Sequence, residues 1–453
     1  MRVRPTPDMP FSRLCALARR PASGRPVRCA VVSGWTTSSL VPLLALFADD
    51  RGLALEVVEA PFGTVFQSLL EGLDDAAPQV IVVLPARSDL PPAFDSALEA
   101  ARWLEAARTA ARRLGAAVIL GGFVVPAERP LGTLQGGVRS DEVDGLRALN
   151  AALAAGSGGG VFFHDTDHLA ATLGLRTWHD PVRWHHSRHA VSFACLPWLA
   201  VDLAAAVEAA LAMGRKCLVV DLDGTLWGGS VADAGADGVE IGDTPAGEAY
   251  QAFQRHLQVL GEAGVLLAVC SRNEREIALR PFASRREMVL RESDFAAFET
   301  GLGDKAELVT AVAARLHLRL DALVYVDDDP VERARIRQAL PDVEVVEMPD
   351  DPAGYVRALD ERRLFSVPLV TVEDSGRTAS LRADEARRAA HLQTDLPTFL
   401  RGLGMRARVA RVGPADVPRA ARLINKTNQF NVTGWTCTES SLAPHVARGD
   451  VLG

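Results

Sequence analysis

The stretch LVVDLDGTLW, residues 218–227, decides the fold of this chain. The apolar run Cys217 to Val220 predicts a buried strand, which leads into Asp221, and Asp223 follows two residues later. Ligands of open parallel sheets bind at the carboxyl ends of the strands, so this pattern places two carboxylates where a site would form. Two acids this close repel each other unless a cation lies between them, which points to a metal.

Short apolar runs recur on both sides of this stretch, and helix-like segments separate them. Strands that alternate with helices predict parallel sheets with helices on both faces, so we expect an α/β chain of two consecutive three-layer domains. The expected strands are Cys29–Ser33, Leu55–Val58, Gln79–Leu84, Ala117–Leu120 and Gly160–Phe163 in the first domain, and Cys217–Val220, Val265–Val269, Met288–Leu290, Leu323–Val326 and Val343–Val346 in the second.

The domain organisation follows from shifts in composition along the 453 residues. We expect five segments: a Pro/Arg-rich leader (1–28), a first α/β domain (29–195), a linker helix (196–214), a second α/β domain (215–365) and a small α+β C-terminal extension (366–453). Between Asp223 and the next strand the sequence has room for a hairpin (228–241) and a helix (246–263). No room remains there for a large cap domain, so a bulky or protein-borne substrate could reach the site.

Composition excludes several classes of protein. With 48% hydrophobic and 23% charged residues the chain is not disordered as a whole. The sequence has no apolar run of the roughly 18 residues that a membrane span needs, and no signal-peptide pattern. A net charge of −8 argues against a nucleic-acid partner, and six separated cysteines without a CxxC pair suggest reduced thiols. We therefore expect a cytoplasmic protein that binds neither nucleic acid nor membrane.

Further polar residues follow the later strands of the second domain. Ser271 ends the segment LLAVCSRN, Lys305 opens a helix in GlyAspLysAla, and Asp327 and Asp328 follow LVYV. Only three of the 49 basic residues are lysines, which gives Lys305 additional weight because an ammonium is a compact point charge. An acid pair, a hydroxyl, a lysine and a second acidic cluster predict a Mg²⁺-dependent phosphoryl-transfer site.

This order of motifs, over residues 215–350, resembles the haloacid dehalogenase (HAD) superfamily of aspartate-based phosphotransferases. The resemblance implies that Asp221 attacks phosphorus and that Asp223 acts as general acid and base. The implied ligands of the phosphoryl group or substrate are Thr225, Ser271, Arg272 and Lys305, and those of the metal are Asp221, Asp223, Asp327 and Asp328.

Longer motifs narrow the resemblance. The segments KCLVVDLDGTLWGG, LAVCSRN, EMVLRESDFA, VDDDPVERARIRQALP and INKTNQFNVT together resemble the FkbH-like family of glyceryl-carrier-protein synthases, subfamily IIIC of the HAD superfamily. The family resemblance implies that 1,3-bisphosphoglycerate is dephosphorylated and its glyceryl unit transferred to the phosphopantetheine thiol of an acyl carrier protein, in polyketide-type biosynthesis. One departure is Gly224, where the family commonly has Asn.

Chemistry of the family passes through an enzyme thioester, and Cys270 beside Ser271 is the candidate nucleophile. Successive strand residues point to opposite faces, so both side chains reach the site only if the strand ends between them. The alternative is that Cys270 is a buried small hydrophobic residue, which we expect for Cys217.

Lys426 and Asn428 lie in the amide-rich segment NKTNQFNVT and are candidate substrate ligands, although a capped loop would use the same residues. By resemblance this segment begins an acetyltransferase-like module. The chain ends too early for a complete one, so we expect no acetyl transfer.

The first domain resembles SGNH hydrolases in its strand order and in the spacing of Asp165 and His168, with Ser33 in the place of the nucleophile. No GlyAspSer motif surrounds Ser33, so we expect a domain without hydrolytic activity. Six histidines between His164 and His189 leave a zinc site open, although an aromatic-rich interface explains them as well.

Two other functions remain open for the second domain. One is a plain phosphatase that acts on a small metabolite or a phosphoprotein. The other is a non-catalytic scaffold for a carrier protein, whose acids only hold a structural cation.

Overall fold

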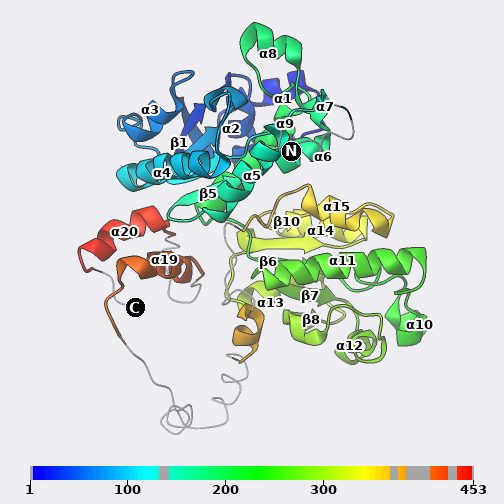
Figure 1. The fold of residues 1–453 in the computed structure, drawn as a ribbon. Coiled ribbons are helices and arrows are strands. Elements are labelled where there is room, and N and C mark those ends of the chain that lie inside the picture. The colour runs from blue at the N-terminus through cyan, green and yellow to red at the C-terminus, as the bar shows by residue number, and fades with distance from the viewer. Residues whose placement is uncertain are drawn as a thin grey trace. The chain divides into compact units, whose positions relative to one another are not determined.

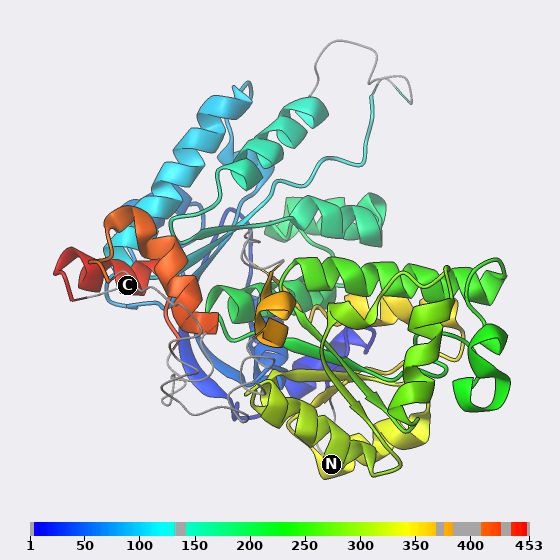
Figure 2. The ribbon, with the colours of Figure 1, turned by 90° about the horizontal axis from the view of Figure 1, so that it is seen from below.

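The computed structural model describes residues 4–130, 132, 142–367, 376–383, 409–426 and 436–450. The chain divides into two compact units. The first comprises residues 1–213 with 409–427 and 431–453, and the second comprises residues 214–408 with 428–430. Each unit is built on one five-stranded parallel sheet with helices on both faces, as Figures 1 and 2 show. The expectation of an α/β fold with two three-layer arrangements is confirmed at this level.

The first sheet has the strand order β2-β1-β3-β4-β5. Its strands are β1 (Arg25–Ser33), β2 (Leu53–Glu59), β3 (Val80–Leu84), β4 (Ala117–Gly121) and β5 (Val161–His164). Its helices are α1 (Phe11–Leu17), α2 (Val41–Asp50), α3 (Val65–Leu70), α4 (Ser96–Leu114), α5 (Glu142–Ala155), α6 (Thr166–Leu173), α7 (Leu175–Trp178), α8 (Pro181–Ser187) and α9 (Leu196–Ala210). This order is the flavodoxin-like arrangement of doubly wound folds.

The two faces of the first sheet are buried by different helices because successive strand residues point to opposite sides. In β1, Val27, Cys29 and Val31 pack against α2 and α9, whereas Ala30 and Val32 pack against α3, α4 and α5. Helix α9, expected to be a linker, is a core helix of this unit. Nearly all of its side chains are buried, because its sequence is apolar around the whole helix rather than along one stripe.

The segment expected to be a leader is also part of the first unit. Helix α1 buries Leu14 and Leu17, and β1 begins at Arg25 rather than Cys29. In the C-terminal segment, α19 (Val417–Lys426) and α20 (Glu439–Ala447) pack on each other through a small cluster that includes Ala421 and Leu442. The acetyltransferase-like character of this segment stays a prediction.

The second sheet has the strand order β10-β9-β6-β7-β8. Its strands are β6 (Cys217–Val220), β7 (Leu266–Ser271), β8 (Phe295–Thr300), β9 (Leu323–Val326) and β10 (Glu344–Val345). Its helices are α10 (Val231–Gly238), α11 (Pro245–Glu262), α12 (Arg275–Ser284), α13 (Lys305–Arg315), α14 (Pro330–Ala339) and α15 (Tyr355–Asp360). Counted within the unit, this is the 3-2-1-4-5 order of the Rossmann arrangement.

Strands β6 and β9, which carry the acidic motifs, are buried on both faces. Leu218 and Val220 pack with α11, α12 and α15, and Cys217 and Val219 pack with α13 and α14. All side chains of β6 and β9 are buried. A continuous apolar run is what such a strand requires, and β6 and β9 have the bounds predicted for them.

Two expected elements of the second unit are wrong. Residues Met288–Leu290 form no strand, because the side-chain oxygen of the buried Gln254 accepts the backbone amides of Val289 and Leu290 at 2.9 and 3.0 Å. The next strand is β8 instead. The expected hairpin at 228–241 is the helix α10, closed at its base by a single antiparallel bridge between Gly228 and Glu240.

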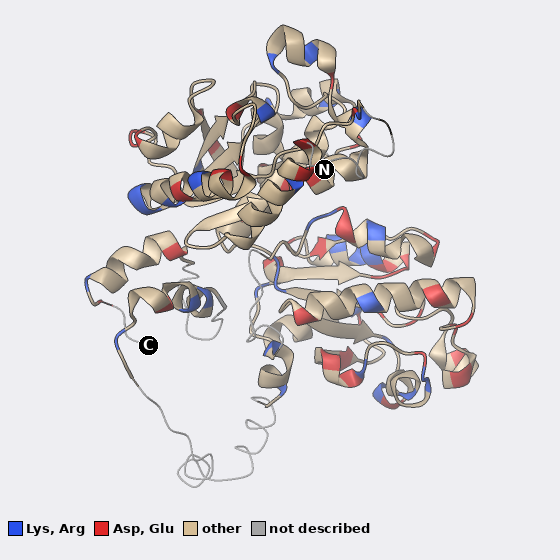
Figure 3. Cartoon of the chain, viewed as in Figure 1, with Lys and Arg blue, Asp and Glu red and all other residues tan. Residues whose placement is uncertain are grey.

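Charges of both signs share the helix surfaces of both units. Figure 3 shows Lys or Arg and Asp or Glu side by side on α4 of the first unit and on α14 of the second. Within the described part of the chain, every helix is too short or too polar to cross a membrane.

The burial of α9 predicts a large loss of stability when its core side chains are shortened. Leu203 is fully buried, and we expect Leu203→Ala to lower the free energy of unfolding by about 2–5 kcal/mol because it leaves a cavity. Leu98→Ala on α4 is the matched control, since Leu98 is 69% exposed. Urea denaturation followed by circular dichroism would measure both. Equal midpoints for the two variants would show that α9 does not belong to the core.

Candidate active site

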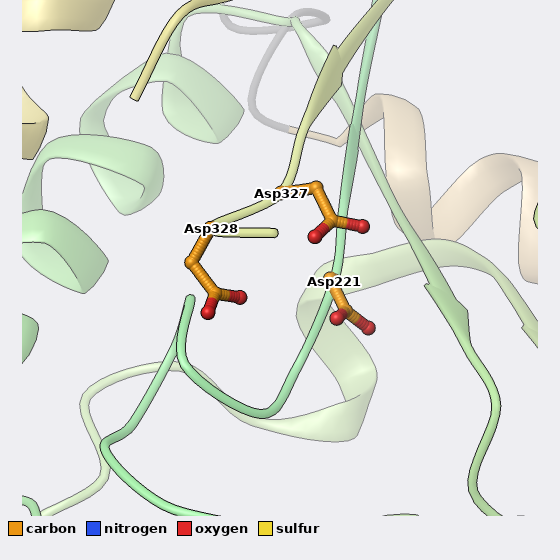
Figure 4. Close-up of side chains that lie close together, drawn as sticks. All are labelled: Asp221, Asp327 and Asp328. Carbon is orange, nitrogen blue, oxygen red and sulfur yellow. The ribbon is translucent and has the colours of Figure 1, made fainter. Parts of the chain in front are cut away.

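The acidic residues meet at the point where the order of the second sheet reverses. The chain passes from β6 to β7 and β8 on one side of β6 and then crosses to β9 on its other side. The switch point therefore lies between β6 and β9. The two strands pair in parallel with Val220 opposite Val326, which places Asp221 beside Asp327. Figure 4 shows the carboxylates of Asp221, Asp327 and Asp328 at the ends of these strands.

Three carboxylates form a cluster suited to a divalent cation. One oxygen each of Asp221, Asp327 and Asp328 lies within 4.8 Å of the others, and Asp221 and Asp327 are buried. Oxygen donors with this much negative charge are those that Mg²⁺ and Ca²⁺ take in proteins. The donor set therefore fits a hard divalent cation.

Gly224 and Thr225, which lie between β6 and α10, hold the carboxylate of Asp328 in place. The Thr225 hydroxyl donates to Asp328 Oδ1 at 3.2 Å and accepts from the Asp328 amide at 3.1 Å. Gly224 has φ +72°, and a Cβ there would lie 2.2 Å from the Asp328 carboxylate. Glycine suits this position because it adopts a positive φ without strain and leaves room for the Asp328 carboxylate. Thr225 thus positions an acid of the cluster, and its expected contact with phosphate stays a prediction.

Lys305 neutralises part of the cluster. It is the first residue of α13, and its buried ammonium donates to Asp221 Oδ2 at 2.8 Å and to Asp327 Oδ2 at 2.6 Å. Burial alone would lower the pKa of Lys305, but the charges of these two carboxylates raise it above its usual value. The lysine is therefore a fixed positive charge beside the acids.

Two acids of the cluster, Asp221 and Asp328, have raised pKa values. Burial raises the pKa of Asp221 to about 7, and the charge of Asp327 adds to this effect while Lys305 opposes it. Burial and the Asp327 charge also raise the pKa of Asp328. Three negative charges beside one ammonium thus leave an excess of negative charge that a cation would relieve.

Asp223 lies apart from this cluster of carboxylates. Its Oδ1 accepts from Trp227 Nε1 at 2.8 Å and from the Val231 amide at 3.1 Å, and its Oδ2 accepts from Asn273 Nδ2 at 2.9 Å. These donors fix the orientation of the side chain. The Asp223 carboxylate is not part of the group formed by Asp221, Asp327 and Asp328, and its expected role as a metal ligand stays a prediction.

Ser271 and Arg272 follow β7 at the same edge. Ser271 is buried, and its hydroxyl oxygen accepts from the Asn273 amide at 3.3 Å. The guanidinium of Arg272 forms an ion pair with Glu332 in the first turn of α14, and the Arg272 side chain is 46% exposed. A buried hydroxyl and a partly exposed guanidinium could both meet an anionic substrate.

Cys270 is a core residue, which agrees with the alternative of a buried small hydrophobic residue rather than with a nucleophile. Strand β7 runs through Ser271, so Cys270 points to the face that α13 covers, and it is fully buried there. Its thiol donates to the Lys305 carbonyl at 3.7 Å. Burial and the nearby Asp221 charge raise its pKa above the usual value, which disfavours the reactive thiolate. Cys217 is likewise buried in the core, as expected.

Two further candidates fall partly outside the described structure. Lys426 ends α19, but its side chain and the whole of Asn428 are outside the described residues. Their binding role stays a prediction.

In the first unit the expected SGNH residues make local hydrogen bonds. The Ser33 hydroxyl donates to the Leu84 carbonyl and accepts from the Trp35 amide, both at 3.1 Å. Asp165 caps α6 by accepting the His168 amide, and His168 is exposed. Among the described residues, the acidic cluster of the second unit is the one group of histidine, cysteine or acidic side chains that could hold a metal ion. The described histidines of the first unit form no such group. These contacts agree with a structural role for Ser33 and Asp165.

Sequence reasoning missed three residues of the site. The Tyr325 hydroxyl donates to Asp327 Oδ2, Asn273 binds Asp223, and Glu332 binds Arg272. Tyr325 lies two residues before Asp327, and strand alternation could have placed the two side chains on one face. Asn273 and Glu332 lie just beyond a strand end and in a helical first turn, where spacing alone does not fix side-chain direction.

Comparison with known proteins relates the chain to one solved structure in particular. No family model matches the chain, and no curated protein matches it. The crystal structure of the N-terminal part of the protein BF1531 from Bacteroides fragilis, which contains a phosphatase domain and is complexed with Mg, matches with a TM-score of 0.72 and 25% identity. The match covers 79% of this chain and 99% of that chain. This chain therefore shares its fold with a protein that contains a Mg-complexed phosphatase domain.

The raised pKa of Asp221 predicts that cation binding depends on pH. In the cation-free protein the folded state keeps this proton up to about pH 7, whereas the unfolded chain loses it near 3.8, so this group makes stability fall as pH rises between those values. A bound cation must displace the proton, so affinity rises with pH through this range. We expect Mg²⁺ to raise Tm more at pH 8 than at pH 6, as measured by differential scanning fluorimetry.

The control for this experiment is Asp221→Asn, which has no proton to displace at this position and should show a smaller pH dependence, because only the raised pKa of Asp328 remains. An equal Mg²⁺-induced gain in Tm at both pH values in the unaltered protein would contradict the assignment of Asp221 to the cation site.

Proposed function

We propose that the second unit is a Mg²⁺-dependent phosphatase of the HAD type. The observation that carries this proposal is the convergence of Asp221, Asp327, Asp328 and Lys305 at the switch point of the sheet. The structural match to a protein with a Mg-complexed phosphatase domain supports it independently. A phosphate monoester is hydrolysed very slowly without a catalyst, and a site of fixed charges suits that reaction.

The roles of Asp221 and Asp223 in this chemistry are those that the resemblance to HAD proteins implies. Asp221 attacks phosphorus, so that an aspartyl phosphate forms while the ester P–O bond breaks, and Asp223 gives a proton to the leaving oxygen. Water then attacks the phosphorus, Asp223 takes back a proton, and inorganic phosphate leaves with the Asp221 carboxylate restored. Lys305 holds Asp221 in place through its 2.8 Å contact. Mg²⁺, when bound by the acidic cluster, would neutralise charge on the phosphoryl oxygens.

The proposal predicts the effect of removing the nucleophile. Asp221→Asn should lower the rate of Mg²⁺-dependent p-nitrophenyl phosphate hydrolysis by at least about a hundredfold, because an amide cannot form the phosphoenzyme. Asp233→Asn on α10 is the matched control, since Asp233 is exposed, and it should keep the rate. Full activity in the Asp221→Asn variant would refute the mechanism and favour a non-catalytic scaffold.

We propose further that the substrate is 1,3-bisphosphoglycerate and that the product is a glyceryl thioester on an acyl carrier protein. The sequence motifs that resemble FkbH-like proteins support this proposal. The path from β6 to β7 also supports it, because residues 221–265 contain α10 and α11 and no separate cap domain. The carrier thiol would attack the acyl carbon of the acyl phosphate, so that the C–S bond forms, the C–O bond breaks and inorganic phosphate leaves with the thiol proton. The remaining phosphate ester would be hydrolysed at Asp221.

Carrier loading can be tested by mass spectrometry of a holo carrier protein incubated with the full chain, Mg²⁺ and 1,3-bisphosphoglycerate. We expect a mass gain of one glyceryl unit that requires Asp221. Since Cys270 is buried, Cys270→Ala should retain loading, with p-nitrophenyl phosphate hydrolysis as the control for folding.

Two results would count against parts of this proposal. An unchanged carrier mass in the presence of active phosphatase would leave the plain phosphatase as the function. Loss of loading alone in Cys270→Ala would show that the thiol takes part, against its buried position.

A further inference from the structure

The first unit contains a cavity of about 700 Å³ at the carboxyl edge of its sheet. The order β2-β1-β3-β4-β5 reverses between β1 and β3, and ligands of doubly wound sheets bind at this reversal. The cavity is lined by Trp35, which follows β1, and by residues 84–88, which begin at the last residue of β3. Gly122 after β4 and Thr166 after β5 complete this edge. The cavity therefore occupies the position at which this topology places a ligand.

The wall of the cavity is mainly apolar and aromatic. Three indoles, from Trp35, Trp178 and Trp184, face it together with leucine, valine, proline and alanine side chains. Trp35 and Trp178 are buried in the core cluster of the unit, which fixes their positions. A preformed apolar cavity of this volume is typical of sites for small organic molecules.

The charges at the cavity disfavour an anionic ligand. Arg87 is the one Lys or Arg among the described residues that line it, and its guanidinium is already bound. It forms an ion pair with Glu142 and donates to the carbonyls of residues 90–92 at 3.1 to 3.2 Å. Glu128 adds a further negative charge at the rim. An anion would find no unpaired Lys or Arg among the described lining residues and would lose hydration.

One buried hydroxyl offers a specific polar contact. Thr166 is buried, lines the cavity, and has its Oγ1 2.9 Å from His164 Nδ1. A hydroxyl has one proton and two lone pairs, so whichever tautomer His164 adopts, at least one lone pair of Thr166 stays available. That lone pair can accept a hydrogen bond from a ligand.

We propose that this cavity binds a neutral, predominantly apolar small molecule that carries one hydrogen-bond donor, with Thr166 accepting from that donor. This function goes beyond phosphoryl transfer and belongs to the unit without the acidic cluster. Binding rather than hydrolysis is the role that the contacts support, because the Ser33 hydroxyl already donates to the Leu84 carbonyl.

Two fluorescent probes with the same ring skeleton test the proposal on the full chain. N-phenyl-1-naphthylamine is neutral and has one N–H donor, and 8-anilinonaphthalene-1-sulfonate is the same molecule with an added sulfonate. We expect saturable binding of one neutral probe per chain, and at least about tenfold weaker binding of the sulfonate because its charge would lose hydration in the cavity. Equal affinities, or no saturable binding of the neutral probe, would overturn the proposal.

Variants locate the bound probe. Val124 lines the cavity, and Val124→Asp should weaken binding of the neutral probe at least about tenfold by placing a charge in the apolar wall. Val182→Asp is the matched control, because Val182 is 64% exposed on α8 and does not line the cavity. Both variants should keep p-nitrophenyl phosphate hydrolysis.

A milder variant keeps the test valid if Val124→Asp does not fold. Thr166→Val retains the shape of the side chain, and it should weaken binding several-fold because the N–H of the probe loses its acceptor. Unchanged affinity in a folded Val124→Asp protein, or in Thr166→Val when the first variant does not fold, would refute the site.

Discussion

The buried contact of Lys305 with Asp221 and Asp327 is the constraint on which the second unit depends. Charges removed from water are costly unless they are paired and hydrogen-bonded, and here one ammonium serves two carboxylates at 2.8 and 2.6 Å. The third acid, Asp328, leaves the cluster with more negative than positive charge. The cation-free protein meets this excess by raising the pKa of Asp221 to about 7, so cation binding and proton loss compete for the same carboxylates.

Both sheets reverse their strand order, and the two reversal points have opposite chemistry. In the second unit, acids follow the strands on each side of the reversal and lie within reach of one cation. In the first unit, Trp35 and a proline-containing segment occupy the equivalent positions and line an apolar cavity. The topology sets the location of each site, and the residues that follow the strand ends determine whether the site is charged or apolar.

The sequence was sufficient to predict the central strands and the charged residues of the site. Strands β6 and β9 were predicted at their observed bounds because a strand buried on both faces must be a continuous apolar run. Tertiary contacts decided the other cases. Val289 and Leu290 have strand-like side chains, yet Gln254, far from them in sequence, takes their amides. Likewise α9 resembled a linker by position, and its burial on all sides became clear only from its neighbours.

The sequence left the site predictions open where function depends on the direction of a side chain rather than on its type. Cys270 has the expected element and the expected neighbour, but strand alternation places its thiol in the core that α13 covers. Thr225 has a hydroxyl at the expected turn, but this hydroxyl donates one hydrogen bond to Asp328 and accepts another from it.

The connection from β6 to β7 contains α10 and α11 and no separate cap domain. For a phosphatase of this kind, residues at the edge of the site can supply selectivity. Arg272 is such a residue. Its partner Glu332 is buried, and Glu332 Oε1 forms ion pairs with both Arg272 and Arg335. Because a buried carboxylate favours a paired cation, the Arg272 guanidinium is held at the edge of the site before any substrate arrives. Under the proposed function, a substrate with a second anionic group would meet an oriented cation, and a substrate without one would gain nothing from it.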